Sequence, residues 1–264
     1  MHLPDLHIPD RLDFQLQGIW VYLLSQYSPW TVNLAGTYLL QLASFVLPCL
    51  ALDLLLPALA PKFSLRHKTQ VPQKQPSPAQ VRHCILVVMR NNLIVLIPYT
   101  ITTIYTPPGE ELYSMSPILP SFFKLTRDLF LCIMAREVLF YYVHRGLHHP
   151  IIYQYIHKTH HLFPCPVTWT SQYAHPVEHL LANVMPVMLP LILLKSHQVT
   201  AWAFTGTATL EAVIDHSGYD FFGGAARAHD RYHERSRDDY GTLGILDWWH
   251  ETAYEGNEAQ RKMH

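Results

Sequence analysis

Long apolar stretches alternate with short polar segments along this chain. The longest covers residues 35–52 and continues past Asp53 to residue 60. A helix of about 25 residues, rising 1.5 Å per residue, is long enough to cross a hydrocarbon layer about 30 Å thick. Asp5, Asp10 and Asp13 precede it in place of a basic region, which argues against a cleavable signal peptide. The pattern predicts a transmembrane helix in this region, and a long buried helix is the alternative.

Later apolar segments are weaker candidates for membrane spans. Residues 93–105 form one, although Arg90, Asn91 and Asn92 interrupt its N-terminal extension. Residues 122–143 are long enough to span but include charged side chains, which must then face a bundle interior or reach the interface. Residues 180–194 and 199–214 are each a little short for a full crossing. We expect them to form a helical hairpin that dips into the membrane; a buried soluble hairpin is the alternative.

Charged residues in the loops predict an orientation in the membrane. Residues 61–83 contain Lys and Arg but no acidic residue, whereas residues 106–121 contain Glu110 and Glu111 but no basic residue. The positive-inside rule places the first loop in the cytosol and the second outside it. Following the chain from there places His144, His179 and His216 at the cytosolic face. Residues 69–80 are typical of a Pro-rich linker, so we expect an anchor and linker over residues 1–81 and a second domain over residues 82–264.

Composition excludes several classes of protein. The 264 residues have a formal net charge of −1, which disfavours a nucleic-acid-binding surface. Charged residues make up 15% and apolar residues 49%, which is incompatible with a disordered chain. The cysteines Cys49, Cys84, Cys132 and Cys165 lie far apart and form no C-x-x-C motif. This spacing disfavours a disulfide scaffold, a zinc finger and an iron–sulfur site.

Histidine is unusually frequent, with 18 residues. Most lie between residues 144 and 233, and four pairs there are separated by four positions, which places both members on one face of a helix. The candidate metal ligands are His144 and His148; His157, His160 and His161; His175 and His179; His216; and His229 and His233.

The number of candidate ligands favours two bound metals. A catalytic zinc ion takes three protein ligands, so eight to ten imidazoles exceed the needs of one ion. Imidazole suits Zn, Fe, Cu and Ni, and the scarcity of nearby thiols argues against a site for soft metals. A disordered histidine-rich metal buffer is the alternative, but such buffers usually have low-complexity sequences, whereas these histidines lie in mixed, aromatic-rich sequence.

Four local strings, in this order, resemble the fatty acid hydroxylase/sterol desaturase superfamily of membrane enzymes. They are YYVHRGLHHP at 141–150, IHKTHH at 156–161, SQYAHPVEH at 171–179 and VIDHSGYD at 213–220. The last two are most similar to the C-4 methylsterol oxidase branch. The similarity covers about residues 82–252, and its motifs are specific as a set although each is weak alone.

The resemblance implies an all-α, multi-pass membrane helical bundle with a histidine cage for two non-haem iron ions at the cytosolic face of the endoplasmic reticulum membrane. It implies O2-dependent hydroxylation, oxidation or desaturation of a C–H bond in a sterol, a triterpenoid or another lipid. Electrons would come from NAD(P)H through a reductase and a cytochrome. A catalytically inactive metal-binding membrane protein of the same fold is the alternative.

Carried over position by position, the resemblance assigns eight ligands: His144, His148, His157, His160, His161, His216, His229 and His233. It leaves His175 and His179 either as ligands or as residues that support ligands. Glu178 and Asp230 are carboxylates that could orient a ligating imidazole by accepting its second ring N–H.

Two positions depart from the family pattern. The final motif of the family usually reads H-x-x-H-H, and Tyr232 stands where the first histidine of the doublet is expected. A phenolate from Tyr232, a water molecule or Glu234 could take the place of the missing ligand. Further on, the family often has Gly before Thr, whereas here Glu251 precedes Thr252.

Overall fold

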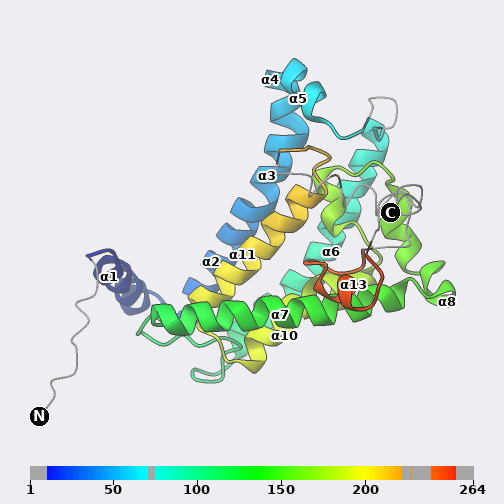
Figure 1. The fold of residues 1–264 in the computed structure, drawn as a ribbon. Helices are drawn as coiled ribbons and strands as arrows, with labels where there is room; N and C mark the ends of the chain where they lie inside the picture. The colour runs from blue at the N-terminus through cyan, green and yellow to red at the C-terminus, as the bar shows by residue number, and fades with distance from the viewer. Residues whose placement is uncertain (1–10, 71–74, 222–226, 228–238, 254–264) are drawn as a thin grey trace, which may run out of the picture.

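The computed structural model describes residues 11–70, 75–221, 227 and 239–253, and these residues form helices joined by loops, with no β-sheet among them (Figure 1). The all-α expectation is confirmed. The longer helical elements are α1 (Arg11–Gln26), α2 (Pro29–Gln41), α5 (Pro61–His67), α6 (Pro78–Tyr105), α7 (Phe122–Leu147), α10 (Met185–Leu193) and α11 (Gln198–Asp215). The shorter ones are α3 (Leu47–Leu50), α4 (Leu56–Leu59), α8 (Pro150–Tyr153), α9 (Pro176–Glu178) and α13 (Ile245–Trp249).

The expected first membrane span is one long helix over Pro29–Leu59. Two π-helical segments, η1 (Leu42–Val46) and η2 (Ala51–Leu55), interrupt its α-helical geometry. Each lies just before a proline, Pro48 or Pro57. Proline lacks an N–H and its ring clashes with the carbonyl four residues earlier, and a wider π turn relieves that conflict. The helix therefore continues through both prolines.

The structure has two further helices of sufficient length and apolar composition to cross a membrane, Pro78–Tyr105 and Pro176–Leu193. The helix over Pro78–Tyr105 is longer than the apolar segment over residues 93–105 suggested, because the polar residues before residue 93 do not interrupt it. Asn91 is buried and donates to the carbonyls of Gln172 and Ala174. Its neighbour Asn92 donates to the side chain of Gln172. These amides attach α6 to η5 (Thr168–Gln172) instead of ending the helix.

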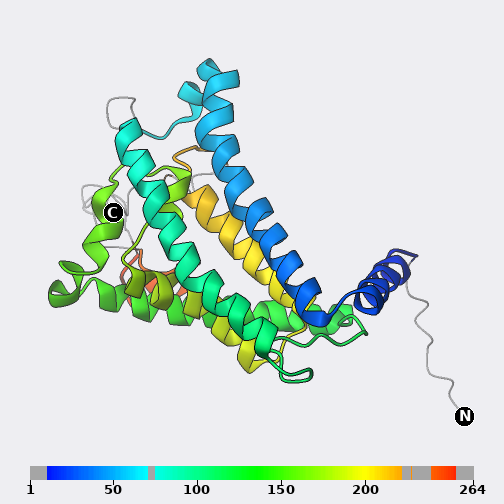
Figure 2. The ribbon, with the colours of Figure 1, turned by 180° about the vertical axis from the view of Figure 1, so that it is seen from behind.

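Of the two arms expected to form a membrane-dipping hairpin, the first belongs to the helix over Pro176–Leu193, which is long and apolar enough to span; the second, α11, and the expected span α7 do not meet the composition of a membrane span. α11 lies alongside the helix formed by α2 to α4, and α7 crosses the ends of these helices at a steep inclination (Figure 1 and Figure 2). Gly36 allows the close approach of α2 to α11, because a Cβ there would lie 2.1 Å from the Trp202 ring. On α7 the acidic side chains Asp128 and Glu137 are buried, as expected for charges that face a bundle interior.

Residues 1–81 and 82–264 pack together through the described parts of the chain. Thr69 N–H donates to the carbonyl of Gly218 over 2.9 Å, and the hydroxyls of Ser64 and Tyr219 lie 2.6 Å apart. The division into an anchor and a second domain stays a prediction. What these contacts establish is that the segment after the first span touches the chain just after α11.

The Glu137 carboxylate anchors the loop that leads into α13. It accepts hydrogen bonds from the backbone N–H groups of Thr242, Leu243, Ile245 and Leu246 over 2.8–3.2 Å, and from the Thr242 hydroxyl. Gly241 leaves room for this carboxylate, because a Cβ there would lie 2.7 Å from Glu137 Oε1. Burial acts to raise the pKa of Glu137, but these hydrogen bonds outweigh it and hold the pKa below its ordinary value.

We predict that Glu137→Gln lowers the free energy of unfolding by about 3 kcal/mol, because one carboxylate oxygen becomes an NH2 group that faces buried N–H donors. Thermal unfolding of the purified protein in detergent measures this. Glu211→Gln is the matched control, since Glu211 pairs with Arg136 at a partly exposed site and should cost less than about 1 kcal/mol. Equal losses in the two variants would contradict the anchoring role of Glu137.

The same carboxylate gives a pH dependence. Because the pKa of Glu137 is lower in the folded chain, its stabilisation is complete above the unfolded pKa of about 4.3 and is lost as the pH falls through the folded pKa. The stability difference between native protein and Glu137→Gln should therefore shrink below about pH 4.

Candidate metal centre

Six of the predicted ligands come together in the described residues, next to the C-terminal end of α7. They lie in the last turn and C-cap of α7, in the 3-10 helix η4 (His157–Leu162) and at the C-cap of α11. These are His144, His148, His157, His160, His161 and His216.

The histidines of η4 lie on a 3-10 helix, whereas the four-residue spacing predicted an α-helix. In a 3-10 helix residues three apart lie in line, and the rings of His157 and His160 accordingly stack with centroids 5.7 Å apart. His161 also stays near His157, with ring centroids 4.7 Å apart. One short turn thus brings three imidazoles into the cluster.

His157 is at the centre of the cluster. Its Nε2 atom lies 3.0 Å from Nε2 of His148 and 3.0 Å from Nε2 of His161. Ligand nitrogens of His144, His148 and His157 all lie within 4.8 Å of one another. Two nitrogens bound at right angles to one ion, each at about 2.1 Å, are about 3.0 Å apart. The 3.0 Å spacings of His157 Nε2 from His148 and His161 therefore fit a shared metal ion.

Four of the rings are oriented by a hydrogen bond at Nδ1. His144 bonds to the carbonyl of Tyr240 over 2.8 Å, His160 to that of Tyr173 over 3.1 Å, and His216 to that of Ala212 over 2.8 Å. His157 bonds to a carboxylate oxygen of Glu178 over 2.8 Å. A backbone carbonyl or an ionised carboxylate can only accept, so with Glu178 ionised Nδ1 carries the proton and Nε2 of each neutral ring carries the lone pair that a metal binds.

Burial keeps these imidazoles neutral. It lowers the pKa of His144 to about 3, with His148 adding to the effect, and it lowers the pKa of His216 to about 3, with His160 adding to the effect. The pKa values of His157 and His160 also fall, chiefly through burial. Neutral imidazole is the metal-binding form, so no proton competes for these nitrogens near pH 7.

The rings form a continuous group that extends to His216. Centroids of His144 and His157 lie 5.0 Å apart, and those of His160 and His216 lie 5.5 Å apart. Tyr240 lies against this group, with its ring centroid 5.0 Å from that of His148. A group of this length can hold more than one ion.

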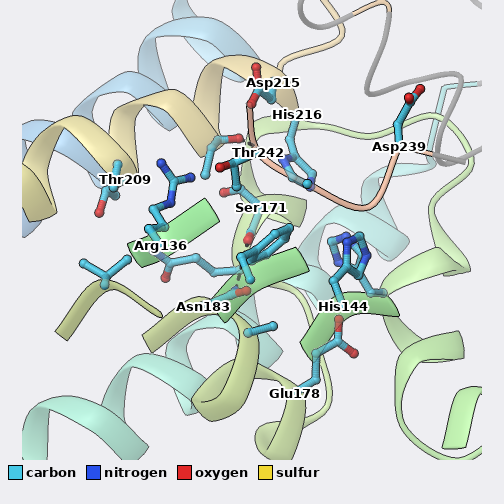
Figure 3. Close-up of a pocket in the computed structure, with 18 of the residues that line it drawn as sticks. Arg136, His144, Ser171, Glu178, Asn183, Thr209, Asp215, His216, Asp239 and Thr242 are labelled. Carbon is cyan, nitrogen blue, oxygen red and sulfur yellow. Dashed lines mark hydrogen bonds between the residues drawn. The ribbon is translucent and has the colours of Figure 1, made fainter. Parts of the chain in front are cut away.

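The cluster opens onto a cavity of about 510 Å³ (Figure 3). His144, His157, His160 and His216 are part of its wall. Figure 3 shows Thr209 on the opposite side of this space from His144. Its lining also includes apolar side chains from α7, η6 (His179–Val184), α10 and α11: Phe140, Ala182, Val187, Ala208 and Ala212.

The remaining predicted residues have separate positions. Glu178 lies 2.8 Å from Nδ1 of His157, and its role in orienting a metal ligand stays a prediction. His175 is the N-cap of α9 and accepts from the N–H of Val177 over 3.2 Å. His179 is buried and its Nδ1 lies 3.3 Å from the amide of Asn183. A direct metal bond from either of these histidines stays a prediction. His229, Asp230, Tyr232, His233 and Glu234 lie outside the described residues.

Several residues that support the cluster were not predicted. The Asp247 carboxylate accepts from the N–H groups of Tyr240 and Gly241, and so fixes the carbonyl that orients His144. No sequence pattern indicates a role for a backbone carbonyl. Glu251, by contrast, stands where the family often has Gly, as the sequence showed. Its backbone is left-handed, with φ of 55°, a conformation that glycine adopts without steric cost.

We predict that Glu178→Gln lowers metal affinity by about 10- to 100-fold, because the amide no longer fixes the proton on His157 Nδ1 as a carboxylate does. Metal titration of the metal-free protein in detergent measures this. Glu211→Gln is the control for a lost acid on a neighbouring helix. The same affinity in all three proteins would mean that Glu178 only fills space.

Comparisons with known proteins agree with this geometry. Residues 129–252 match the family model described as fatty acid hydroxylase. The chain is 34% identical over 219 residues to a fatty acid hydroxylase of Mycosarcoma maydis, covering 77% of this chain and 56% of that protein. It is 32% identical to a protein of Dictyostelium discoideum that is provisionally named a methylsterol monooxygenase, covering 70% and 71%. It is 29% identical to a very-long-chain aldehyde decarbonylase of Oryza sativa, covering 88% and 89%.

The chain spans less than two thirds of the length of the first curated relatives, 56% in the Mycosarcoma maydis protein and 62% in a fatty acid hydroxylase domain-containing protein of Macaca fascicularis. No solved structure matches it. The family match covers the three segments that carry the described histidine cluster, and the Dictyostelium discoideum relative is more than 30% identical over more than two thirds of both chains; the chain therefore belongs to the fatty acid hydroxylase/sterol desaturase superfamily.

Proposed function

We propose that this protein is a membrane-bound, non-haem di-iron oxygenase that hydroxylates, oxidises or desaturates a C–H bond of a sterol, a triterpenoid or another lipid. The observation that carries the proposal is the group of six histidines, four of them with Nδ1 fixed on an acceptor, beside a cavity of about 510 Å³. The names of the superfamily relatives favour lipids as the substrate class.

The histidines fit two iron ions in number and in donor type, because imidazole nitrogen is a good ligand for iron. Two reduced iron ions held by these residues would supply the redox chemistry that cleavage of O2 and attack on an unactivated C–H bond require. His144, His148, His157 and His161 are the residues we assign to one end of the centre. His160 and His216 are assigned to the other end, and His229 and His233 stay ligands predicted from the sequence alone.

The residues of this chain have three tasks in the reaction. Acceptors at Nδ1 hold the imidazoles in the metal-binding tautomer, as Glu178 does for His157. The buried position of the cluster keeps bulk water away from the oxidising centre. Apolar walls that include Phe140 and Val187 give an apolar substrate a place to lie within reach of the histidines.

The electron donor and the location in the cell follow from the same proposal. Side chains with ordinary redox chemistry do not supply electrons repeatedly, so NAD(P)H must reduce the centre through a partner such as a reductase with a cytochrome. Such partners act from the cytosol, on the endoplasmic reticulum membrane. The cluster must then face the cytosol.

Contacts at the two ends of α11 support this orientation. After its last residue, the chain from Ser217 to Asp220 hydrogen-bonds to the basic segment at Lys68 and Thr69. At its first residue, Gln198 N–H donates to the carbonyl of Ser114, in the loop that contains Glu110 and Glu111. The basic loop and the histidine cluster therefore share one end of the bundle, and the acidic loop lies at the other.

We predict two iron ions per chain in anaerobically purified protein, and O2 uptake when lipid and a reductant are added. His160→Ala and His161→Ala should each lose metal and abolish uptake, since His161 is assigned to one end of the centre and His160 to the other. His67→Ala should retain both properties, because the His67 ring bonds to the carbonyl of Phe63 in its own helix and packs against Phe63 and Phe221, away from the histidine cluster. Elemental analysis and an oxygen electrode give the two readings.

The outcomes separate the proposal from its alternative. Two metals without lipid-dependent O2 uptake would identify the inactive metal-binding protein of this fold. One transition metal or none per chain would overturn the di-iron centre itself. The aldehyde decarbonylase relative makes it useful to analyse the products as well as the oxygen consumed.

We also predict that a membrane-impermeant maleimide labels Lys158→Cys in intact microsomes and labels Glu110→Cys only after the membrane is permeabilised. Both positions are exposed, and the four native cysteines are buried. The opposite pattern would reverse the orientation and remove the access of a cytosolic electron donor.

A further inference from the structure

The exposed side chains of residues 243–249 are all apolar. The charged residue of this segment, Asp247, is buried and turns inward to the N–H groups of Tyr240 and Gly241. Figure 1 shows α13 beside α7, towards the end of α7 that carries the histidines. The exposed side chains are Leu243 (46%), Ile245 (44%), Trp248 (74%) and Trp249 (71%).

The backbone behind this apolar surface is fixed. Glu137 accepts four N–H groups of residues 242–246. At the end of α13, the His250 ring stacks on Tyr141 with centroids 5.2 Å apart and bonds to the Tyr142 hydroxyl over 3.0 Å. The tryptophans are therefore held outward by packed structure. A fixed patch of large apolar side chains marks a surface that another apolar body covers.

Contacts through the histidine cluster place this surface near the depth at which a membrane span ends. The span over Pro176–Leu193 has Glu178 in its first turn, and Glu178 bonds to His157. The His157 and His144 rings lie 5.0 Å apart, and His144 bonds to the carbonyl of Tyr240, just before α13. The first turn of the span and the start of the α13 loop thus meet the same cluster.

The apolar surface continues along α7. Leu131, Val138 and Tyr142 are exposed and follow one another on one face of this helix, at spacings of seven and four residues. Tyr142 joins that face to α13 through His250. On its other side α7 packs against α10, which is part of the span over Pro176–Leu193. The patch is therefore continuous with the outer surface of the membrane-spanning bundle.

The order of side chains along this surface matches the layers of a lipid leaflet. Leu131 and Val138 come first and suit hydrocarbon. Tyr142 follows, level with the tryptophans of α13, and Tyr and Trp are the residues that concentrate where acyl chains meet headgroups. Arg145 is exposed and comes next along α7, where its guanidinium would meet lipid phosphates. A soluble partner protein would not require this order.

We propose that residues 243–249 dock into the lipid leaflet at the histidine end of the bundle, with Trp248 and Trp249 at the boundary between acyl chains and headgroups. In the orientation proposed above this is the cytosolic leaflet. Gly241, Thr242 and Gly244 of the same loop line the cavity of about 510 Å³. The loop is thus the wall between that cavity and the leaflet. This docking does not rest on the oxygenase activity.

Spin labels on the full chain in phosphatidylcholine nanodiscs test the docking. Leu243→Cys and Ile245→Cys carry the label, and the four native cysteines are buried. O2 concentrates in lipid and a nickel chelate stays in water, so the ratio of their effects on label relaxation reports depth. Leu47→Cys, exposed on the long first span, is the lipid reference, and Lys158→Cys, exposed on η4, is the water reference.

We expect both labels on the loop to be relaxed more by O2 than by the chelate, as at Leu47→Cys and in contrast to Lys158→Cys. Stronger relaxation by the chelate would place the loop in water and overturn the proposal. Protection from both reagents would show that protein covers the surface, as in contact with a second copy of the chain, and would overturn it as well.

The tryptophans can be tested with a matched control. Trp248→Ser combined with Trp249→Ser should shift the Ile245→Cys label towards the nickel chelate, whereas Trp30→Ser, at an exposed position of α2, should leave it unchanged. Metal titration of the double variant should match the native protein, because the loop still orients His144. An unchanged label in the double variant would overturn the proposal. If the double variant does not fold, the labels in the otherwise native chain decide.

Discussion

The hydrogen bond from His157 to Glu178 is the interaction on which the arrangement of the histidine cluster depends. It fixes the proton of the central imidazole on Nδ1 and leaves the lone pair on Nε2, the atom that meets His148 and His161 at 3.0 Å. The same bond joins η4 to the start of the apolar helix over Pro176–Leu193. One buried carboxylate therefore sets both the chemical state of the cluster and its attachment to the membrane part of the fold.

The sequence predicted the histidine cluster best where local geometry decides the direction of the side chains. His144 and His148 are four residues apart on α7, and the structure keeps them in one cluster. His175 was predicted with them from the same spacing, but Pro176 starts a new helix there, so His175 takes the N-cap position and its ring turns to the N–H of Val177. The spacing of the histidines alone does not predict that proline changes the position of His175.

Other features depend on contacts between distant segments and were therefore hidden in the sequence. Charged and amide residues on α6 and α7 counted against membrane helices, yet Asn91 and Glu137 each satisfy backbone groups more than 80 residues away. The carbonyls of Tyr240, Tyr173 and Ala212 orient ligands, and a carbonyl is common to every residue. Composition measures how polar a segment is, but only the folded chain shows which polar groups meet.

The loop that holds the Tyr240 carbonyl has a consequence for the order of events during synthesis. His144 precedes Tyr240 by 96 residues, and Glu137 precedes Thr242 by 105. The ribosome therefore completes α7, η4 and α11 well before the loop that orients His144 leaves the exit tunnel. Until then one imidazole of the cluster has no fixed tautomer. The histidine cluster therefore reaches its final geometry only after this loop has packed onto α7.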